Sequence, residues 1–418
     1  MHEPAGQGPL ISIIMANHQG AGYLGAALRS VVAQTYVNWE LIVADDGSSD
    51  GSVAILQDVA AQDARVRVLL HETPSGPAAA RNRALAAAGG DWVAICDSDD
   101  VMHPDRLRRL LAAAEELDAD AVADDMIHFA TEPLAGPRRV LGDDAPDVAR
   151  KIEAADMLRV PELGESGGQL GYLKPLIRRS ALGALRYDET LQIGEDQDFY
   201  LQLLLQGAGF WLVPEALYLY RRHPQSLSHR SNRAQVAATL AALAALCARL
   251  SPDQMFELEG VITHRRRVLQ GRLAFETLAE HLKTRHYDRA LAQILRHPSL
   301  IPRLARVAMA KVRSTGVGQG GAIPVRAGEI LHLVGPGGHL PETNHGQRTI
   351  EVPDPAADHG CGALWAELCH LASLTELTLT YGDAAGLSAA WRVPGVVHIL
   401  ARGPVISDLS PPKGWRDD

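Results

Sequence analysis

The sequence is poor in cysteine, in long apolar runs and in positive charge. It has four cysteines in 418 residues, few and scattered, which is typical of a protein kept reduced in the cytoplasm. No apolar run approaches about 18 residues without a charge, so we expect no transmembrane helix. The N-terminal segment is polar and lacks a basic region, so we expect no signal peptide either. The net charge of −10 argues against nucleic acid as a partner.

The chain also lacks the glycine pattern of a dinucleotide-binding loop. The segment Gly335–Gly338 does not have the Gly-x-Gly-x-x-Gly spacing and predicts a tight turn instead. The sequence does have an ordinary globular balance, with 46% hydrophobic and 22% charged residues. Positive charge gathers in one region, because residues 261–315 hold twelve Lys or Arg against three Asp or Glu, an excess of nine. Such asymmetry indicates contact with an anionic surface.

Strand-like and helix-like patterns alternate through the first third of the chain. Nearly continuous apolar strands joined by helical segments predict an α/β fold, with a mostly parallel sheet and helices on both faces. In such sheets, ligands bind at the carboxyl ends of the strands. The expected strands are Leu10–Ala16, Glu40–Ala44, Arg65–Leu70 and Trp92–Cys96, and the expected helices are Gly22–Ala33, Val53–Ala61, Ala78–Ala88 and Pro104–Leu117.

Carboxylates follow two of these strands directly. The pair Asp45-Asp46 ends one strand, and the segment Asp97–Asp100, with three aspartates, ends another. Clustered like charges repel and need a cation, and a hard divalent cation held by carboxylates keeps positions open for phosphate oxygens. Two such clusters at one edge of a sheet predict an enzyme that handles a diphosphate ester through Mg²⁺ or Mn²⁺. The alternative for Asp97–Asp100 is a turn that caps the helix at Pro104.

The whole chain divides into three predicted parts. Residues 1–230 form the α/β domain that carries these carboxylates, residues 231–315 form a helical extension, and residues 316–418 form a small α/β unit without an assigned role. The elements expected after the first third are a loop at Thr131–Val148, strands at Tyr172–Arg178, Phe210–Tyr220, Thr375–Thr380 and Val396–Leu400, helices at Glu195–Gln206, Ala234–Leu250 and Leu258–Val312, and a linker at Gly316–Gly321. Pro214 indicates an edge or a bulge within its strand.

Several motifs in residues 9–230 resemble those of the family 2 glycosyltransferases, and they stand in that family's order. They are Ser12–His18, Ser30–Thr35, Trp39–Asp50, Gly76–Asn82, Asp97–Asp99, Gly194–Asp196 and Tyr220–Ser228. The resemblance implies the GT-A fold, a nucleotide-diphosphate sugar as donor (above all a UDP-sugar) and Mn²⁺ or Mg²⁺ as the metal. It also implies transfer with inversion to a glycan or lipid-linked acceptor, as in bacterial polysaccharide assembly, in the cytoplasm or at the inner face of the membrane.

The resemblance assigns nucleotide-binding roles to four positions of this chain. Asp46 matches the aspartate that accepts a hydrogen bond from the nucleotide base. Ala16 and His18 fall where the family lines the base pocket, although a tyrosine or another stacking residue is frequent near His18, so the chain departs from the family there. Arg81 matches an arginine beside the nucleotide, whose planar fork can donate to a base carbonyl or a phosphate oxygen. The alternative for Arg81 is an ordinary charge on a helix surface.

The resemblance also implies how the diphosphate is held. Asp97, with Ser98 beside it, is expected near the ribose hydroxyls, and Asp99 is expected on the metal. Asp100 is expected either to support the metal ligands or to cap the next helix, and the cap is favoured. His223 matches a histidine that reaches the metal or the departing diphosphate. A metal at this point bridges the two phosphates and neutralises the charge that develops as the nucleotide leaves.

Glu195 and Asp196 match the family's acidic pair just ahead of a helix. Asp196 is then the general base that takes the proton of the acceptor hydroxyl, and Glu195 orients the acceptor or is structural. Acids favoured by the dipole of a helix N-terminus are the alternative for both residues. Arg221, Ser226 and Ser228 are expected to donate to phosphate oxygens from a loop that orders over the donor.

The sequence also leaves two alternative functions open and predicts one amphipathic helix. A sugar-phosphate nucleotidyltransferase would use a similar sheet, but the loop Gln19–Gly22 lacks the basic residue that binds a triphosphate in such enzymes. A nucleotide-binding module without activity is the second rival. The segment Leu300–Arg313 predicts a basic amphipathic helix, which either lies on an anionic membrane or packs on the catalytic domain with a solvated basic face.

Overall fold

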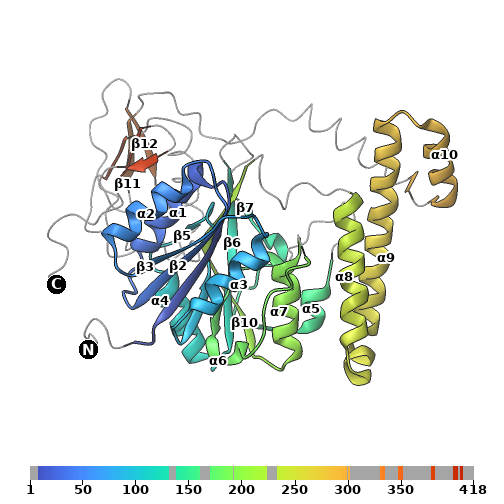
Figure 1. The fold of residues 1–418 in the computed structure, drawn as a ribbon, viewed down its shortest axis with the longest axis horizontal. Helices are drawn as coiled ribbons and strands as arrows, with labels where there is room; N and C mark the ends of the chain where they lie inside the picture. Colours follow the sequence, from blue (N-terminus) through green and yellow to red (C-terminus); the bar gives the residue numbers. More distant parts are fainter. Residues whose placement is uncertain are drawn as a thin grey trace.

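A computed structural model describes most of the chain up to residue 301 and five short strands beyond it. The described residues are 8–130, 138–160, 170–191, 193–223, 233–298, 300–301, 330–334, 347–351, 378–381, 399–402 and 405–407. They form a large sheet flanked by helices, a long pair of helices beside it, and a second, smaller sheet (Figure 1). The expected α/β architecture is confirmed. The domain boundaries near residues 230 and 315 fall outside the described residues and stay predictions.

Ten strands form the large sheet, in the order β3-β2-β1-β4-β9-β6-β10-β5, with β7 paired to β6 and β8 paired to β10. The strands are β1 (Ile11–Asn17), β2 (Trp39–Asp46), β3 (Val66–His71), β4 (Trp92–Ile95), β5 (Val101–Met102), β6 (Ala121–Ala130), β7 (Arg138–Arg139), β8 (Arg150–Ile152), β9 (Leu176–Arg178) and β10 (Phe210–Arg222). Strands β1 to β4 are parallel, as expected. Strand β9 then runs antiparallel to both β4 and β6.

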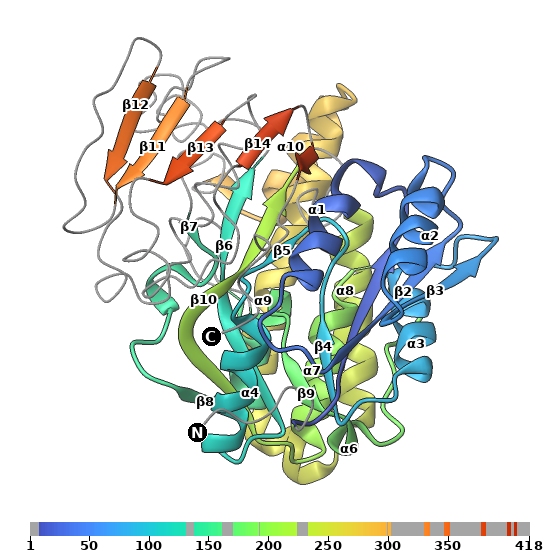
Figure 2. The same ribbon diagram turned by 90° about the vertical axis from the view of Figure 1, so that its left-hand side faces the viewer.

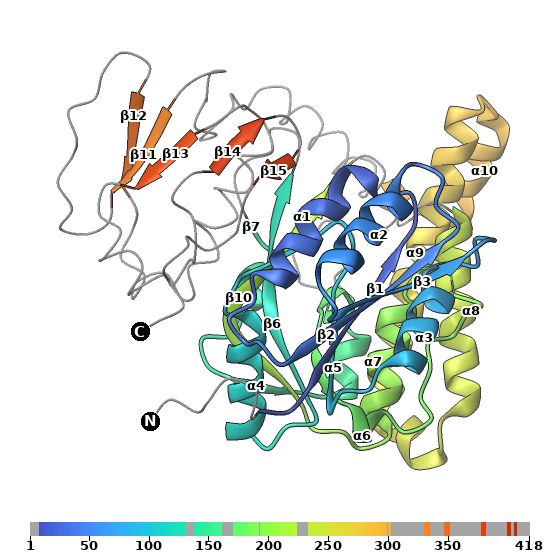
Figure 3. The same ribbon diagram turned by 60° about the vertical axis from the view of Figure 1, so that its left-hand side comes forward.

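Helices surround the sheet, as Figures 2 and 3 show. They are α1 (Ala21–Val32), α2 (Ser52–Gln62), α3 (Pro77–Ala87), α4 (Arg106–Glu116), α5 (Ala154–Leu158), α6 (Arg179–Leu182) and α7 (Glu195–Leu205), with short 3-10 turns at η1 (Gly142–Asp144) and η2 (Leu170–Tyr172). Successive side chains of a strand point to opposite faces of its sheet. Because every residue from Ile11 to Met15 of β1 is buried, both faces are covered there.

Strand β6 is the longest described strand that the sequence analysis did not identify, and two buried aspartates explain why. Asp124 and Asp125 interrupt its apolar pattern, yet both side chains are fully buried. Asp124 pairs with Arg106 of α4 at 2.7 Å, and Asp125 pairs with Arg139 of β7 at 2.7 Å. Buried charges are tolerated when they are paired and hydrogen-bonded, so the strand survives a pattern that would otherwise mark a loop.

Three other expectations need small corrections. The loop predicted at Thr131–Val148 contains β7 and η1 in its described part. The strand predicted at Tyr172–Arg178 is η2 followed by the shorter β9, and α4 begins after Pro104 instead of at it. The bulge expected at Pro214 is confirmed, because the register of β10 against β6 shifts between Val213 and Tyr218.

Two long helices, α8 (Arg233–Arg249) and α9 (Pro252–Lys283), stand side by side next to the sheet (Figure 1). Ser251 begins α9 with a capping box, in which its side chain accepts from the Gln254 N–H and Gln254 bonds back to the Ser251 N–H. Leucines of both helices, including Leu243, Leu246 and Leu258, belong to the same hydrophobic core as the sheet. The extension therefore packs directly on the α/β domain.

The helical periodicity expected over Leu258–Val312 is divided between two helices in the part of it that is described. Helix α9 ends at Lys283, Arg285 takes a left-handed conformation with φ of 59°, and a separate helix α10 (Tyr287–Arg296) folds back on α9. Ala290 and Leu300 pack there on Ala274 and Leu278 of α9. Almost all of the predicted basic helix from Leu300 onward lies outside the described residues.

A second sheet has the strand order β12-β11-β13-β14-β15. Its strands are β11 (Ile330–Val334), β12 (Gln347–Glu351), β13 (Thr378–Tyr381), β14 (Ile399–Arg402) and β15 (Val405–Ser407). Strands β13 and β14 overlap the two strands predicted for the C-terminal unit, whereas the predicted linker Gly316–Gly321 lies outside the described residues. Among the helices that are described, none combines the length and the apolar character needed to cross a membrane.

Candidate active site

The carboxyl ends of β1, β2 and β4 form one rim of the sheet, and the predicted aspartates lie there. Asn17 at the end of β1 stands in register with Asp45 of β2, and its amide donates a 2.7 Å hydrogen bond to Asp45 Oδ2. Asp45 Oδ1 accepts from the backbone N–H of Ser48 at 2.9 Å. Asp45 therefore shapes the turn that follows β2, which leaves Asp46 as the carboxylate directed at the neighbouring loop.

Asp46 is buried and accepts four hydrogen bonds. Its Oδ2 accepts from the backbone N–H groups of Ser75 (2.8 Å) and Gly76 (2.7 Å), and its Oδ1 accepts from the Ser75 hydroxyl (2.8 Å) and Arg83 Nη2 (2.7 Å). Burial acts to raise the pKa of Asp46, but these donors outweigh it and hold the pKa below its ordinary value. Because a carboxylate offers about four lone-pair sites, a base N–H reaches Asp46 only when Arg83 or the Ser75 hydroxyl moves aside.

The two residues expected in the base pocket lie beside Asp46. Ala16 is half-buried in β1, opposite Ala44 of β2. His18 is exposed, and its Nδ1 lies 2.7 Å from the backbone oxygen of Asp46, so this nitrogen carries the proton and donates. The structure thus brings Ala16, His18 and Asp46 together, and their contact with a nucleotide base stays a prediction.

Arg81 is buried in α3 and faces three carboxylates. Its Nη2 lies 2.8 Å from Asp97 Oδ1, and its Nη1 lies 2.7 Å from Glu195 Oε1 and 3.4 Å from Asp196 Oδ1. Burial acts to lower the pKa of Arg81, yet the charges of Asp196, Asp97 and Glu195 raise it well above its ordinary value. Arg81 therefore joins Asp97, which is expected to contact the donor nucleotide, to Asp196, the predicted general base. Its contact with the nucleotide stays a prediction, since both terminal nitrogens of its fork already face carboxylates.

Lys174 is a second buried cation in the same cluster, just ahead of β9. Its Nζ lies 2.8 Å from Asp97 Oδ2 and 2.8 Å from Asp196 Oδ2. Burial acts to raise the pKa of Asp97, but Lys174 and Arg81 hold it far below its ordinary value. Burial also acts to lower the pKa of Lys174, and the charges of Asp196 and Asp97 raise it well above its ordinary value. The two cations and the carboxylates form a closed ring of ion pairs, and it fixes Asp97 and Asp196 relative to each other.

Asp196 lies in the first turn of α7, and one of its oxygens accepts no hydrogen bond, although Arg81 Nη1 lies 3.4 Å from it. Gly194 takes a left-handed conformation with φ of 84° directly before the helix, which glycine adopts without strain. Lys174 donates a 2.8 Å hydrogen bond to Asp196 Oδ2, whereas Asp196 Oδ1 has no hydrogen-bond partner in the described part of the chain. Burial and the charge of Asp196 raise the pKa of Glu195, against the effect of Arg81.

Three carboxylates and a histidine form a group suited to a metal ion. Asp97, Asp99 and Asp100 offer oxygens that all lie within 4.8 Å of one another, and His223 Nε2 lies 2.9 Å from Asp99 Oδ2. Asp100 Oδ2 is buried without a hydrogen-bond partner among the described residues. Burial, with the charges of Asp99 and Asp97, raises the pKa of Asp100 well above its ordinary value. Carboxylate oxygens with one imidazole are ligands that Mn²⁺ accepts, so these residues fit a divalent cation.

The helix cap expected of Asp100 is wrong. Asp100 Oδ1 accepts a 2.7 Å hydrogen bond from the backbone N–H of Arg221 in β10, because β5 separates this turn from α4. Arg221 also donates from Nε to the backbone oxygen of Asp99 at 2.7 Å, and its guanidinium lies 5.2 Å from the ring of Tyr23. Arg221 therefore braces the Asp99 turn, and its phosphate contact stays a prediction.

Two further expectations concern serines near this turn. Ser98 is half-buried in it, beside Gly20 of the loop after β1. Its expected place next to the nucleotide stays a prediction. Ser226 and Ser228 lie outside the described residues.

Sequence reasoning missed Lys174, Arg83 and Tyr218. The Tyr218 hydroxyl accepts a 3.0 Å hydrogen bond from the Asp97 N–H and so supports the donor motif from β10. Lys174 did carry a signal, because it stands between Leu173 and Pro175 in a stretch that is buried, and lysine is almost never buried without a partner. Nothing in the sequence distinguished Arg83 from an ordinary charge on a helix surface.

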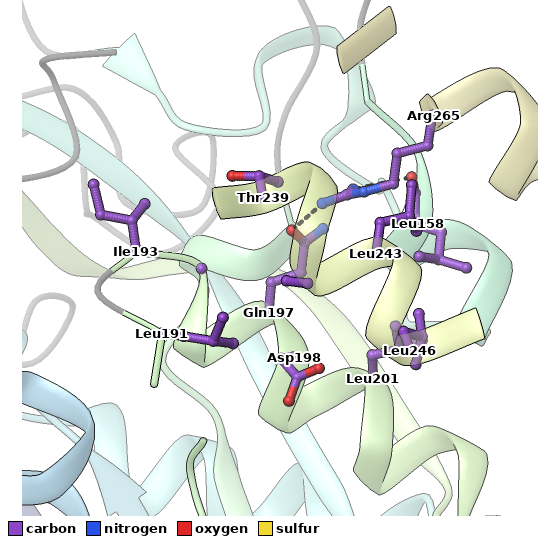
Figure 4. Close-up of a pocket in the computed structure, with 12 residues that line it drawn as sticks. Leu158, Leu191, Ile193, Gln197, Asp198, Leu201, Thr239, Leu243, Leu246 and Arg265 are labelled. Carbon is purple, nitrogen blue, oxygen red and sulfur yellow. Dashed lines mark hydrogen bonds between the residues drawn. The ribbon is translucent and has the colours of Figure 1, made fainter. Parts of the chain in front are cut away.

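Figure 4 shows a different hollow, between α7, α8 and α9. Five of its twelve lining residues are leucines, and it spans about 420 Å³ that is partly open to solvent. Arg265 of α9 donates there to Gln197 Oε1 (2.6 Å) and to the backbone oxygen of Leu158 (3.1 Å). Burial, with Arg272 nearby, lowers the pKa of Arg265 to about 10. The metal-binding candidates and Asp196 do not line this hollow, so it is separate from the rim.

A mixed sheet with carboxylates at the strand ends and an acidic pair opening a helix is the arrangement of a GT-A glycosyltransferase. Residues 12–161 match the model of the family described as glycosyl transferase family 2. The chain is 30% identical over 319 residues to the succinoglycan biosynthesis protein ExoO of Rhizobium meliloti (strain 1021), covering 73% of this chain and 86% of that protein. It is also 30% identical over 300 residues to ExoU of the same organism, covering 70% and 84%. The chain belongs to glycosyltransferase family 2.

Solved structures give weaker similarities. One is TarS 1-349 of S. aureus in complex with UDP, at 20% identity and a TM-score of 0.45, covering 62% of this chain and 69% of that one. Another is the mannosyltransferase PcManGT of Pyrobaculum calidifontis in complex with GDP-Man and Mn²⁺, at 16% identity and a TM-score of 0.46, covering 73% and 82%. Family membership makes the chain a nucleotide-sugar glycosyltransferase and does not favour either rival, the nucleotidyltransferase or the inactive binding module.

Proposed function

We propose that this enzyme transfers a sugar from a UDP-sugar to a hydroxyl of a glycan or lipid-linked glycan, with inversion at the anomeric carbon. The observation that carries the proposal is the buried ring in which Lys174 and Arg81 join Asp97 to Asp196, with the candidate metal ligands at its edge. A polysaccharide acceptor is supported by the relatives ExoO and ExoU, which are named for succinoglycan biosynthesis.

Asp196 is the general base of the proposed reaction. Its Oδ1 takes the proton of the acceptor hydroxyl while the hydroxyl oxygen bonds to the anomeric carbon of the donor sugar. The bond from that carbon to the diphosphate oxygen breaks on the opposite face, so the configuration inverts in one displacement, by the same logic as in inverting hydrolases. Lys174 donates to Asp196 Oδ2, so the proton goes to Oδ1, which accepts no hydrogen bond and has Arg81 Nη1 3.4 Å away.

Asp99 and His223 hold Mn²⁺ or Mg²⁺ in this proposal, with Asp97 and Asp100 close by. The bound cation supplies Lewis-acid stabilisation of the charge on the departing nucleotide diphosphate. Asp100 and Arg221 keep the Asp99 turn in place through the hydrogen bonds between β10 and the turn.

The base of the nucleotide binds between Ala16, His18 and Asp46 in this proposal. Uracil fits a carboxylate acceptor because its ring N–H is flanked by two carbonyl oxygens, and Arg83 stands beside Asp46 with donors for one of them. Ser98 and Asp97 then lie on the side of the ribose, and Arg81 and Arg221 on the side of the phosphates. An acceptor carried by a lipid would also bring the enzyme to a membrane surface.

The test is a screen of nucleotide sugars for stabilisation and turnover. A bound donor raises the melting temperature by mass action, so the matching UDP-sugar should stabilise the protein in Mn²⁺ more than in chelator. Asp99→Ala should abolish both the metal-dependent stabilisation and sugar transfer. Asp58→Asn, which changes an exposed carboxylate of α2, is the matched control and should retain both. Unchanged transfer from every nucleotide sugar in Asp99→Ala would overturn the proposal.

A further inference from the structure

Helix α10 carries a stripe of exposed apolar side chains that packs on nothing described. Tyr287, Leu291 and Leu295 follow one another at intervals of four residues, so they share one side of the helix. Their side chains are exposed, as are those of the flanking Leu282 and Ile301. The exposed fractions are 65% for Tyr287, 59% for Leu291, 71% for Leu295, 42% for Leu282 and 57% for Ile301.

The orientation of this stripe is fixed by packing on the other side of α10. Ala290 is buried against Ala274 and Leu278 of α9, and Ile294 packs against the same cluster. Gln293 adds a 3.2 Å hydrogen bond to the backbone oxygen of Ala274. Because one side of α10 is held by α9, the exposed leucines cannot turn inward, and the stripe, defined as Tyr287, Leu291 and Leu295, stays on the surface.

The surroundings of the stripe are positively charged. Between His281 and Ile301 the chain has four Lys or Arg and one Asp, although its overall charge is −10. The basic residues are Lys283, Arg285, Arg289 and Arg296, and all of them are exposed. Arg289 and Arg296 lie on the side of α10 away from the stripe, as the helical repeat of 3.6 residues requires. An apolar side opposite a cationic side is the pattern of helices that lie in the interface of an anionic bilayer.

The position of α10 in the molecule is compatible with contact with a bilayer surface. Helix α9 has 32 residues and is therefore about 48 Å long, and it carries α10 at its C-terminal end. In Figures 1 and 2, which are turned about a shared vertical axis, α10 lies toward the same end of the molecule as the arrowheads of β6 and β10. Strand β10 ends next to His223, so α10 lies toward the end of the sheet that holds the candidate metal ligands.

We propose that α10 lies on an anionic membrane surface, with the stripe buried at the boundary of headgroups and acyl chains and the basic residues in contact with lipid phosphates. This contact keeps the enzyme at a surface that also holds acceptors carried on a lipid. The choice of a lipid-linked acceptor rests on the proposed function, whereas the membrane contact rests on α10 itself. Phosphate contacts of Lys and Arg near such a surface add to the binding of the apolar stripe.

The experiment is co-sedimentation of the full chain with vesicles. Binding is expected to vesicles that contain phosphatidylglycerol, and to weaken with salt and with pure phosphatidylcholine. Leu291→Glu combined with Leu295→Glu should lower the vesicle affinity by about tenfold or more per leucine, from the apolar area that each one loses. Phe256→Glu is the matched control and should bind like the wild type, because Phe256 is 82% exposed but lies near the other end of α9.

Three results of the vesicle experiment would overturn the proposal. It is overturned if the wild type does not sediment with anionic vesicles, or if the double variant binds them equally well. It is also overturned if the stripe variant only converts a dimer into a monomer, because the stripe is then an interface between copies of this chain. Leu291→Ser with Leu295→Ser provides a milder pair if the glutamates disturb folding, which circular dichroism would reveal.

The same samples separate this proposal from the proposed function. The stripe variant should keep sugar transfer to an acceptor that is free in solution, whereas Asp196→Asn should lose transfer and still bind vesicles. Loss of vesicle binding without loss of transfer in the stripe variant supports the membrane surface alone. Full transfer by Asp196→Asn contradicts the proposed base and leaves the vesicle result to stand by itself.

Discussion

Lys174 Nζ lies 2.8 Å from Asp196 Oδ2 and 2.8 Å from Asp97 Oδ2, so one buried ammonium joins the proposed base to the donor motif. The antiparallel strand β9 makes this possible. Because β9 runs against β4, the residues just before β9 reach the carboxyl end of β4, where Asp97 lies. A parallel strand at the same place would have put Lys174 at the opposite edge of the sheet.

Lys174→Met should cost both stability and activity. It leaves Asp97 and Asp196 buried with one cation fewer, and breaking a buried ion pair from one side costs about 3–5 kcal/mol. Transfer should fall by at least about 10²-fold, because the proposed base loses the group that orients it. Lys174→Arg is the control and should recover part of the stability through the same charge. Urea unfolding and initial transfer rates measure the two effects, and a Lys174→Met variant with normal rates would contradict the role of Lys174.

The Asp46–Arg83 pair predicts a specific pH dependence of stability. The folded-state pKa of Asp46 is depressed, so its contribution is fully present above the unfolded value of about 3.9 and is lost as pH falls through the folded value. Arg83→Gln removes one cause of that depression. The gap in unfolding free energy between wild type and Arg83→Gln should therefore be largest near neutral pH and should shrink below about pH 4.

Urea unfolding at several pH values measures this gap. Arg67→Gln, which changes an exposed arginine of β3, is the control and should show a gap that does not vary with pH. A gap for Arg83→Gln that stays constant down to about pH 3 would mean that Arg83 does not act through the ionised form of Asp46.

Removal of the metal should abolish transfer, and replacement of its proposed ligands should change the amount of metal needed. Chelation removes the charge that stabilises the leaving diphosphate, so activity should vanish and return with Mn²⁺. His223→Ala should raise the Mn²⁺ concentration for half-maximal activity by at least about 10- to 100-fold, because loss of a direct ligand costs no less than loss of a residue that only orients one. His264→Ala on α9 is the control. Transfer that resists chelation would contradict a metal-dependent reaction.

Arg106 and Asp124 predict a strong structural effect away from the rim. Both side chains are fully buried, and the guanidinium of Arg106 also donates to the backbone oxygen of Lys174. Arg106→Met leaves a buried carboxylate without its cation and should cost about 3–5 kcal/mol of unfolding free energy. The double variant Arg106→Met with Asp124→Leu should recover much of that loss, because it removes both charges. Equal stability of the single and double variants would contradict this account.

The sequence predicted the part of the fold in which local pattern and burial agree. Strands β1, β2 and β4 contain continuous apolar runs in a parallel sheet, and their positions follow from that pattern. Strand β6 could not be found in the same way, because Asp124 and Asp125 look like loop residues until their partners Arg106 and Arg139 are known. These ion pairs join residues that are distant in the sequence, so a short segment of sequence does not reveal them.

The site residues also fall into those that the sequence predicted and those that it did not. Asp46, Asp97, Asp99 and Asp196 stand next to strand or helix ends, so their positions in the sequence already placed them at one rim. Lys174 reaches Asp97 because β9 runs antiparallel to β4. Asp100 was mistaken for a helix cap because it accepts its hydrogen bond from β10, a strand distant in the sequence. Residues that act through long-range partners were therefore the ones missed or misassigned.

The most direct test of the account is the rate of sugar transfer by Asp196→Asn, measured together with donor binding. The amide keeps the shape of the side chain and its place at the start of α7, but it cannot take a proton from the acceptor. The account predicts a loss of transfer of about 10²- to 10⁴-fold, with donor affinity close to that of the wild type. Transfer at the wild-type rate, from a properly folded variant, would contradict the central claim that Asp196 is the base.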